Sequence, residues 1–427
     1  MFYKKLFITS LLFINFSSCS VGELQKVNNI SLNSSIPIPS IVTTVNNSNN
    51  TSQVINKPKF TEPVTQAKII TPEIKLNSIQ KVLKANNISD YEYIQKEFEA
   101  GGLKLSAIRA DNEFKDFPVT YTTNSLITSI GLIGLNNRDM NNINSLERSK
   151  ALEHVLKIIA IYNIRGNANR ILENHKLKLN ENDAYSTDLA KEIELLFYGN
   201  SNKQVSTNSI SELSQNIDKS NNLTIKTLDI IDYGISLIKL YSKTSLDNSR
   251  IAREYIDKGL IRMLYFGVLS KIADAQLKNQ NNNNQQAIND LLAAEFYYLG
   301  IRNIIKFEGN TNNSYLEEML YLRRFDILDY QKFEEGMNLG IVQKAKLDML
   351  KAVEKINSDF SLSKSLALSS KLYIDTISIE YKNSKYSRNK NKELEDIGNN
   401  FLNAISSKNL KLANENINKL SNIFNLV

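Results

Sequence analysis

The position of the prolines constrains this chain more than any other feature of its sequence. All six lie in the first 118 residues, at positions 37, 39, 58, 63, 72 and 118, and none follows Pro118. Because proline interrupts an α-helix, the long stretch after it is free to form uninterrupted helices. The chain is 42% hydrophobic and 23% charged, which is the balance of a protein that folds around a core. We therefore predict an all-α body.

Apolar residues of this stretch recur at alternating spacings of three and four. Such spacing keeps one apolar stripe toward a neighbouring helix, as in coiled coils and elongated bundles, although an ordinary amphipathic helix gives the same pattern over two heptads. We predict an elongated bundle of long antiparallel helices. The clearest examples are Leu152, Val155, Ile159, Tyr162 and Gly166, then Leu228, Ile231, Ile235 and Ile238, and less regularly Ile288, Leu292, Glu295 and Leu299.

The same pattern sets the expected helix boundaries. The segment 336–382 could be one helix of about 70 Å, unless residues 359–365 divide it. Residues 200–222 and 279–286 are polar and without period, and we expect loops there. Helices are predicted at 75–116, 145–176, 183–198, 222–243, 249–278, 286–307, 314–332, 336–382 and 392–424.

One segment, residues 118–135, departs from the helical period. It is rich in Thr, Ile and Val, and no charged residue occurs from Pro118 to Asn137. Since β-branched and aromatic residues favour extended backbone and Pro118 ends the preceding helix, we predict a short strand or hairpin. A buried helix start is the alternative.

The N-terminus has the three parts of a secretory signal. Two lysines within Met1–Lys5 precede the mainly apolar stretch Leu6–Phe16, and small residues follow. This stretch is too short to span about 30 Å of hydrocarbon, and no later segment reaches roughly 20 uncharged apolar residues. We expect the mature chain to contain no transmembrane helix.

The end of this stretch, Phe16-Ser17-Ser18-Cys19, resembles the lipobox of bacterial lipoproteins, although Phe16 replaces the usual aliphatic residue. The resemblance implies that residues 1–18 are a signal peptide and that Cys19 is the lipidated N-terminus. Acylation also accounts for the lone cysteine, which has no partner for an internal disulfide. The alternative is a secreted protein with a free cysteine. The residue after the cysteine is Ser20 and not the aspartate that alters the sorting of lipoproteins between membranes. The resemblance therefore implies an outer-membrane anchor with the body in the periplasm.

Residues 19–72 combine five prolines with asparagine-rich runs, and we predict a disordered tether that precedes a helical domain at 73–427. Charge bears on the partners of this domain. Of the formal charge of +7, the signal and the tether carry +2 each, which leaves +3 for residues 73–427. No sustained basic face results, so nucleic acid is not an expected partner.

The order of segments in residues 77–175 resembles the first half of a TolC-like outer-membrane factor. Leu83–Asn87 opens the region, Leu103–Phe117 leads to Pro118, the uncharged Thr-rich segment follows, and Leu146–Asn174 is the returning helix. The resemblance implies a role in transport or secretion across the outer membrane. The second half of the chain offers no comparable β segment. Without it, the edge strands of a barrel would have backbone groups in lipid that lack hydrogen-bond partners. The helical architecture could therefore occur without a pore.

The competing architecture is an α-solenoid of tetratricopeptide type, which would act as a scaffold for envelope proteins. Tyr298-Leu299-Gly300 and Ala293–Tyr297 are similar to parts of such repeats, but no period near 34 residues joins them. A third hypothesis is an enzyme that acts on polysaccharide or peptidoglycan. It would need carboxylates that converge in a cleft, which sequence alone does not reveal.

Few residues suggest chemistry. The chain has two histidines, one cysteine and no tryptophan, and His154 and His175 lie 21 residues apart, whereas metal ligands on one helix need spacings of three or four. We expect both histidines at the surface or in helix capping, the pairs Glu317-Glu318 and Glu334-Glu335 on solvated faces, and the 19 tyrosines mainly in helix interfaces.

The sequence thus predicts a non-catalytic envelope lipoprotein without metal or cofactor. Its expected partners are secretion or efflux proteins of the envelope, the membrane through the lipid on Cys19, and a second copy of itself.

Overall fold

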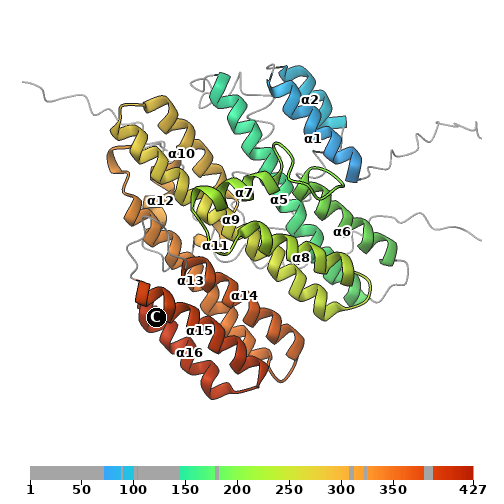
Figure 1. Ribbon diagram of the computed structural model, residues 1–427, viewed down its shortest axis with the longest axis vertical. Coiled ribbons are helices and arrows are strands. Elements are labelled where there is room, and N and C mark those ends of the chain that lie inside the picture. The colour runs from blue at the N-terminus through green and yellow to red at the C-terminus, as the bar shows by residue number, and fades with distance from the viewer. Residues whose placement is uncertain are drawn as a thin grey trace, which may run out of the picture. The chain divides into compact units, whose positions relative to one another are not determined.

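The computed structural model describes residues 72–87, 90–100, 103, 145–177, 182–306, 312–321, 325–378 and 388–426 (Figure 1). The predicted signal peptide with Cys19, the predicted tether up to residue 71 and the predicted β segment at 118–135 lie outside these residues. The described helices all belong to one unit, Ala67–Val427.

Every regular element of the described residues is a helix, and they contain no strand, which confirms the all-α prediction for this part of the chain. The first half contains α1 (Pro72–Asn87), α2 (Tyr91–Ala100), α5 (Ser145–Leu177), α6 (Asn182–Tyr198), α7 (Ile210–Ser220), α8 (Thr227–Tyr241) and α9 (Leu246–Gln280). The second half contains α10 (Asn284–Leu299), α11 (Arg302–Ile305), α12 (Asn313–Tyr321), the short 3₁₀ helix η2 (Phe325–Ile327), α13 (Tyr330–Lys355), α14 (Phe360–Ser378), α15 (Arg388–Ser406) and α16 (Leu410–Phe424).

The predicted boundaries are confirmed for α5 and α6, whereas the single helices predicted at 75–116, 286–307, 314–332 and 392–424 are wrong, because each is divided. The segment 336–382 is divided between α13 and α14 next to residues 359–365, the place where the sequence left a division open. The carboxylate of Asp359 accepts a 2.9 Å hydrogen bond from Leu362 N and begins the new helix. The segment 392–424 is divided between α15 and α16. There the side chain of Asn409 caps α16, with Leu412 N donating over 3.1 Å.

The predicted loop at 200–222 is also wrong in its second half, where α7 forms. Ser209 Oγ accepts a 3.0 Å hydrogen bond from Glu212 N, and the Glu212 carboxylate accepts a 2.6 Å bond from Asn208 N. The first bond satisfies a backbone donor that the first turn of a helix leaves free, and the second joins the residue before the N-cap to the same turn. The serine and the glutamate three residues later are the sequence signal that identifies this helix start.

Helix α9 is the centre of the packing. All residues from Ile256 to Leu269 are buried, so this middle part of the helix has no face toward solvent. It packs against α8 and α10, its neighbours in sequence, and against α5 and α14 (Figure 1). The last helices, α13 to α16, lie side by side as a group in Figure 1, each packed on the next.

Glycines permit the closest approaches between these helices. Gly234 of α8 lies against Ile256 of α9, and Gly259 of α9 lies against Ile231 of α8. Gly340 of α13 lies against the backbone of Ile305 in α11. A Cβ atom at position 340 would be 2.5 Å from Ile305 Cα and 2.7 Å from its carbonyl oxygen. Backbone cannot move aside as a flexible side chain can, so this contact requires glycine.

We expect Gly340→Ala to lower the free energy of unfolding by about 1–3 kcal/mol, because the added methyl group overpacks the contact with α11. The matched control is Gly398→Ala in α15, where the nearest atom to the new methyl group would be Lys371 Cγ at 3.4 Å. That change should be neutral or stabilise by up to about 1 kcal/mol, since alanine is the better helix former. Urea unfolding followed by circular dichroism measures both, and equal stabilities would contradict the packing described.

Candidate functional site

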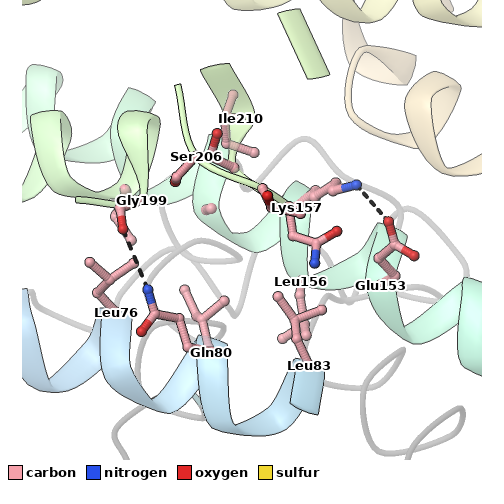
Figure 2. A pocket seen from close by; sticks show the side chains of 15 residues that line it. Leu76, Gln80, Leu83, Glu153, Leu156, Lys157, Gly199, Ser206 and Ile210 are labelled. Carbon is pink, nitrogen blue, oxygen red and sulfur yellow. Dashed lines mark hydrogen bonds and ion pairs between the residues drawn. The ribbon is translucent and has the colours of Figure 1, made fainter. Parts of the chain in front are cut away.

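A small cavity lies between α1, α5 and the segment that joins α6 to α7 (Figure 2). Its volume is about 50 Å³. A cavity of roughly 150 Å³ holds benzene, so this one accommodates the end of an aliphatic side chain rather than a cofactor. Its wall is mostly aliphatic and is formed by Leu76, Ile79, Leu83, Leu156, Ala160, Leu196 and Ile210.

One side of the cavity depends on a turn after α6. Gly199 has a φ of 72°, the left-handed conformation that favours glycine, and a Cβ atom there would collide with the hydroxyl of Ser206. That hydroxyl donates a 2.5 Å hydrogen bond to the carbonyl of Tyr198. Gln80 of α1 donates from Nε2 to the carbonyl of Gly199 over 3.4 Å, which joins α1 to the turn (Figure 2). The turn, and with it the polar rim at residues 206–209, is therefore fixed from both sides.

The opposite rim carries an ion pair of α5. Lys157 Nζ lies 2.7 Å from Glu153 Oε1, one helical turn away (Figure 2). Burial alone would raise the pKa of Glu153, but Lys157, and to a smaller extent Lys150, lower it to about 2. Glu153 is thus an ionised acceptor at neutral pH and has no proton to donate. The cavity combines an apolar interior with a charged and hydroxylic rim, an arrangement suited to binding an apolar group.

A second group of functional side chains is a buried ionic cluster around α9. Arg165 of α5 donates from Nε to Asp257 Oδ1 over 2.5 Å, and Lys258 Nζ lies 2.6 Å from Asp257 Oδ2. Lys258 also lies 3.5 Å from Glu254, and Arg253 lies 3.0 Å from the same carboxylate. Oppositely charged side chains therefore alternate through the interior, which keeps the buried charges paired.

Helices α13 and α14 close this cluster with polar groups. Ser365 donates a 3.0 Å hydrogen bond to Glu254, and Ser369 donates a 2.5 Å bond to Asp348. The ammonium of Lys258 lies 4.7 Å from the ring centre of Tyr373, a cation–π distance. The cluster thus contains side chains from α5, α9, α13 and α14, helices that are distant in sequence.

The cluster shifts the pKa values of its acids in opposite directions. Burial by itself would raise the pKa of Asp257, but the neighbouring Arg165 and Lys258 hold it well below its usual range. Burial raises the pKa of Asp348, and Lys258 and Ser369 offset this only in part. Asp257 is therefore a permanent anion of the interior, whereas Asp348 is easier to protonate than an ordinary aspartate.

The prediction that His154 lies at the surface is wrong. Its ring is buried, stacks on Phe296 at a centroid distance of 6.0 Å and meets the edge of Tyr297 at 5.5 Å. Its Nδ1 has no hydrogen-bond partner within the described residues. Burial, followed by the nearby Lys157, lowers the pKa of His154 to about 3. The folded protein therefore holds this imidazole neutral.

The other residues named from the sequence have mixed outcomes. His175 lies in the last turn of α5, and its Nε2 is 3.2 Å from the hydroxyl of Ser249, as expected for a residue at a polar helix end. Glu334 is buried, so the solvated face predicted for Glu334-Glu335 is wrong at this position.

The acidic pair Glu317-Glu318 is exposed only at Glu318. Glu317 is half-buried, and its carboxylate lies 2.7 Å from Arg302 and 3.2 Å from Lys306. The prediction for tyrosines is confirmed at Tyr297 and Tyr298, which are both buried in the core.

The described residues show neither a metal site nor a membrane-spanning helix. They contain no group of three or more His, Cys, Asp and Glu side chains placed to hold a metal ion. They also include no helix with the length and apolar character needed to cross a membrane. Comparison of the chain with known protein families, curated proteins and solved structures finds no match.

The neutral His154 makes stability depend on pH. The unfolded chain protonates this residue below its ordinary pKa of 6.5, while the folded protein does so only near 3. Its contribution is therefore complete above pH 6.5 and is lost as the pH falls toward 3, with a slope near 1.4 kcal/mol per pH unit. Between pH 6.5 and 4.5 we expect the wild type to lose about 2 kcal/mol more than His154→Leu.

Urea unfolding at the two pH values measures this difference. The control His175→Asn should keep the acid sensitivity of the wild type, because the partner of His175 is a hydroxyl at a helix end. Equal pH dependence of the wild type and His154→Leu would show that the imidazole is not held neutral in the folded protein.

Proposed function

We propose that the chain is a bacterial envelope lipoprotein, anchored by acyl chains on Cys19, whose helical body acts as a scaffold that binds other proteins. The sequence Phe16-Ser17-Ser18-Cys19 supports the anchor. An anchor of this kind implies the outer membrane as location and the periplasm as the compartment of the body.

The observation that carries the scaffold is the pairing of helices that follow one another in sequence. Helix α8 packs on α9, α9 on α10, α13 on α14, α14 on α15 and α15 on α16. Short connections such as 356–359 and 407–409 join them. Helix pairs of this kind are the unit of α-solenoids, which bind proteins along their surfaces. The additional contacts of α9 with α5 and α14 differ from a strict solenoid, in which each unit meets only its neighbours.

The cavity beside α1 offers such a scaffold one defined contact. Its volume fits the end of an aliphatic side chain, and its rim of hydroxyl, amide and charged groups suits the backbone around that side chain. An envelope protein that inserts a leucine or isoleucine here is the partner chemistry that the site accommodates.

A TolC-like transport or secretion component is the second proposal. Helix α5, with 33 residues, supports it, because it coincides with the helix that the resemblance predicts to return from the β segment. The elongated bundle and the β segment at 118–135 remain predictions of this proposal. An enzyme that acts on envelope polysaccharide is not proposed.

Lipidation is tested by labelling cells with a palmitate analogue. We expect the wild type to carry the label and to sediment with membranes, and Cys19→Ser to lose both, because Cys19 is the sole cysteine of the chain. Ser20→Ala, which keeps the cysteine, should label like the wild type. Equal labelling of the wild type and Cys19→Ser would remove the lipoprotein proposal.

Protein binding is tested in the same cells with a photoreactive side chain at Gln80, on the cavity rim. We expect a crosslinked adduct at Gln80 and none at the control position Asn399, an exposed residue of α15. The adduct should disappear in Cys19→Ser, because an unanchored body leaves the membrane. Failure to form an adduct at Gln80 would contradict the scaffold while leaving the lipid anchor intact.

A further inference from the structure

Helix α8 carries two rows of apolar side chains, one buried and one partly exposed. One face is buried on α9 through Ile231, Gly234, Ile235 and Ile238. A second row turns partly toward solvent, where Tyr233 is 51% and Leu240 is 65% exposed, although the ring of Tyr233 also meets that of Tyr255 in α9 at a centroid distance of 4.9 Å. Ile230 and Leu237 extend this second row and are half-buried. We call Ile230, Tyr233, Leu237 and Leu240 the outer stripe.

The outer stripe has the spacing of a helix–helix seam. Its members are separated by three, four and three residues, the pattern that places side chains between those of a second helix. The stripe ends at an exposed polar residue on each side: Lys226 precedes it and Thr244 follows it at the same spacing. The stripe therefore covers about three helical turns and could be covered by one helix of similar length.

Contacts outside the outer stripe also hold α8 in place. Besides the glycine contacts with α9, two side-chain bonds join α8 to α6. Asp232 accepts a short hydrogen bond from the hydroxyl of Tyr198, and Lys239 Nζ lies 2.6 Å from Glu194. Because α8 is fixed on these sides, the stripe is presented on a rigid support.

One edge of the stripe has a symmetric charge pattern. Asp229 and Ser236 lie along one side of α8, and Lys243 follows at the same interval of seven residues in the turn that continues the helix after Tyr241; all three are exposed. Among the described residues, neither Asp229 nor Lys243 forms an ion pair. The edge thus begins with an acid, ends with a base and has a small neutral residue midway between them.

The apolar row and the charged edge of α8 are complementary to those of a second copy of α8 that runs in the opposite direction. In an antiparallel pair of identical helices, Ile230 of one copy packs against Leu240 of the other, and Tyr233 packs against Leu237. The same register places Asp229 opposite Lys243 of the second copy and Ser236 opposite Ser236 of the second copy. A two-fold axis at this position satisfies both the apolar row and the charged edge without a further partner.

We propose that the outer stripe is the contact by which two copies of this chain pair through α8, antiparallel and about a two-fold axis. A membrane surface is the less suitable occupant, because helices that lie on anionic lipid carry basic residues along the polar edge rather than an acid at one end. The proposal goes beyond the scaffold function and does not depend on the lipid anchor.

The size of the contact sets the expected strength. A pair of helices with four apolar residues each buries less than the roughly 1,200 Å² of stable interfaces, so the pairing is reversible in solution. Anchoring two copies in one membrane would raise their effective concentration and favour the pair.

The test is sedimentation velocity on the full chain with Cys19→Ser over a range of concentrations. The wild-type stripe should give a monomer–dimer equilibrium. Asp229→Lys or Lys243→Asp alone places two like charges opposite each other at both ends of the contact and should weaken the dimer about tenfold. The double variant Asp229→Lys, Lys243→Asp restores both pairs and should recover the affinity of the wild type. This recovery is the outcome that a general hydrophobic association does not give.

Leu240→Lys should weaken the dimer by at least about 100-fold, because it removes a leucine contact twice. The control is Leu277→Lys at another exposed leucine, on α9, which should leave the dimer unchanged. In addition, Ser236→Cys in the Cys19→Ser background should be joined by a short bismaleimide linker, whereas Ser407→Cys should not. Thermal unfolding checks that each variant folds.

Three results would overturn the proposal. The first is a monomer at every concentration up to about 1 mM, and the second is a dimer that the charge reversals leave unchanged. The third is an outer stripe that binds vesicles of anionic phospholipid, with that binding lost in Leu240→Lys and no dimer formed. The last result would assign the stripe to a membrane surface.

Discussion

The contact between Arg165 and Asp257 is the interaction on which the rest of this structure depends. A guanidinium and a carboxylate removed from water cost several kcal/mol each, and only close pairing offsets that cost. Here the pair joins α5 to the middle of α9, and Lys258 occupies the second oxygen of the same carboxylate. Because α13 and α14 supply the remaining polar partners, four helices must be in place before the charges are satisfied. The interior therefore specifies one arrangement of these helices.

The position of α9 in turn determines what the surface offers. Gly259 lets α8 approach α9 closely, so that one apolar face of α8 is used in the core and the other is left outside. On the other side of α9, α5 lies where its Glu153 and Lys157 form the rim of the cavity with α1. Both the cavity and the outer stripe are thus consequences of how a single buried helix is surrounded. Both are also sites for apolar groups of another protein, which is consistent with a role in binding.

The sequence predicted the helical class and the boundaries of α5 and α6, because these follow from local apolar spacing. It did not predict α7, for which the serine and glutamate of a capping box at 209 and 212 were the available signal. The burial of His154 and Glu334 was missed because both are ionisable side chains, and only the packing of other helices removes them from water. The ionic cluster was missed for the same reason.

The cavity could not be predicted at all from the sequence. It brings residues 76–83 together with residues 206–210, and no local pattern records that approach. The outer stripe was partly visible, since α8 follows the spacing of three and four. The sequence does not indicate which of its two apolar faces turns toward α9.

The most direct test of this account is the stability of Asp257→Asn, measured by urea unfolding beside the control Asp396→Asn at an exposed site of α15. Because Arg165 and Lys258 would lose their buried counter-charge, the account predicts a loss of about 3–5 kcal/mol at position 257. The control should change by less than about 0.5 kcal/mol. A loss below about 1 kcal/mol at position 257 would contradict the central place given to this ion pair.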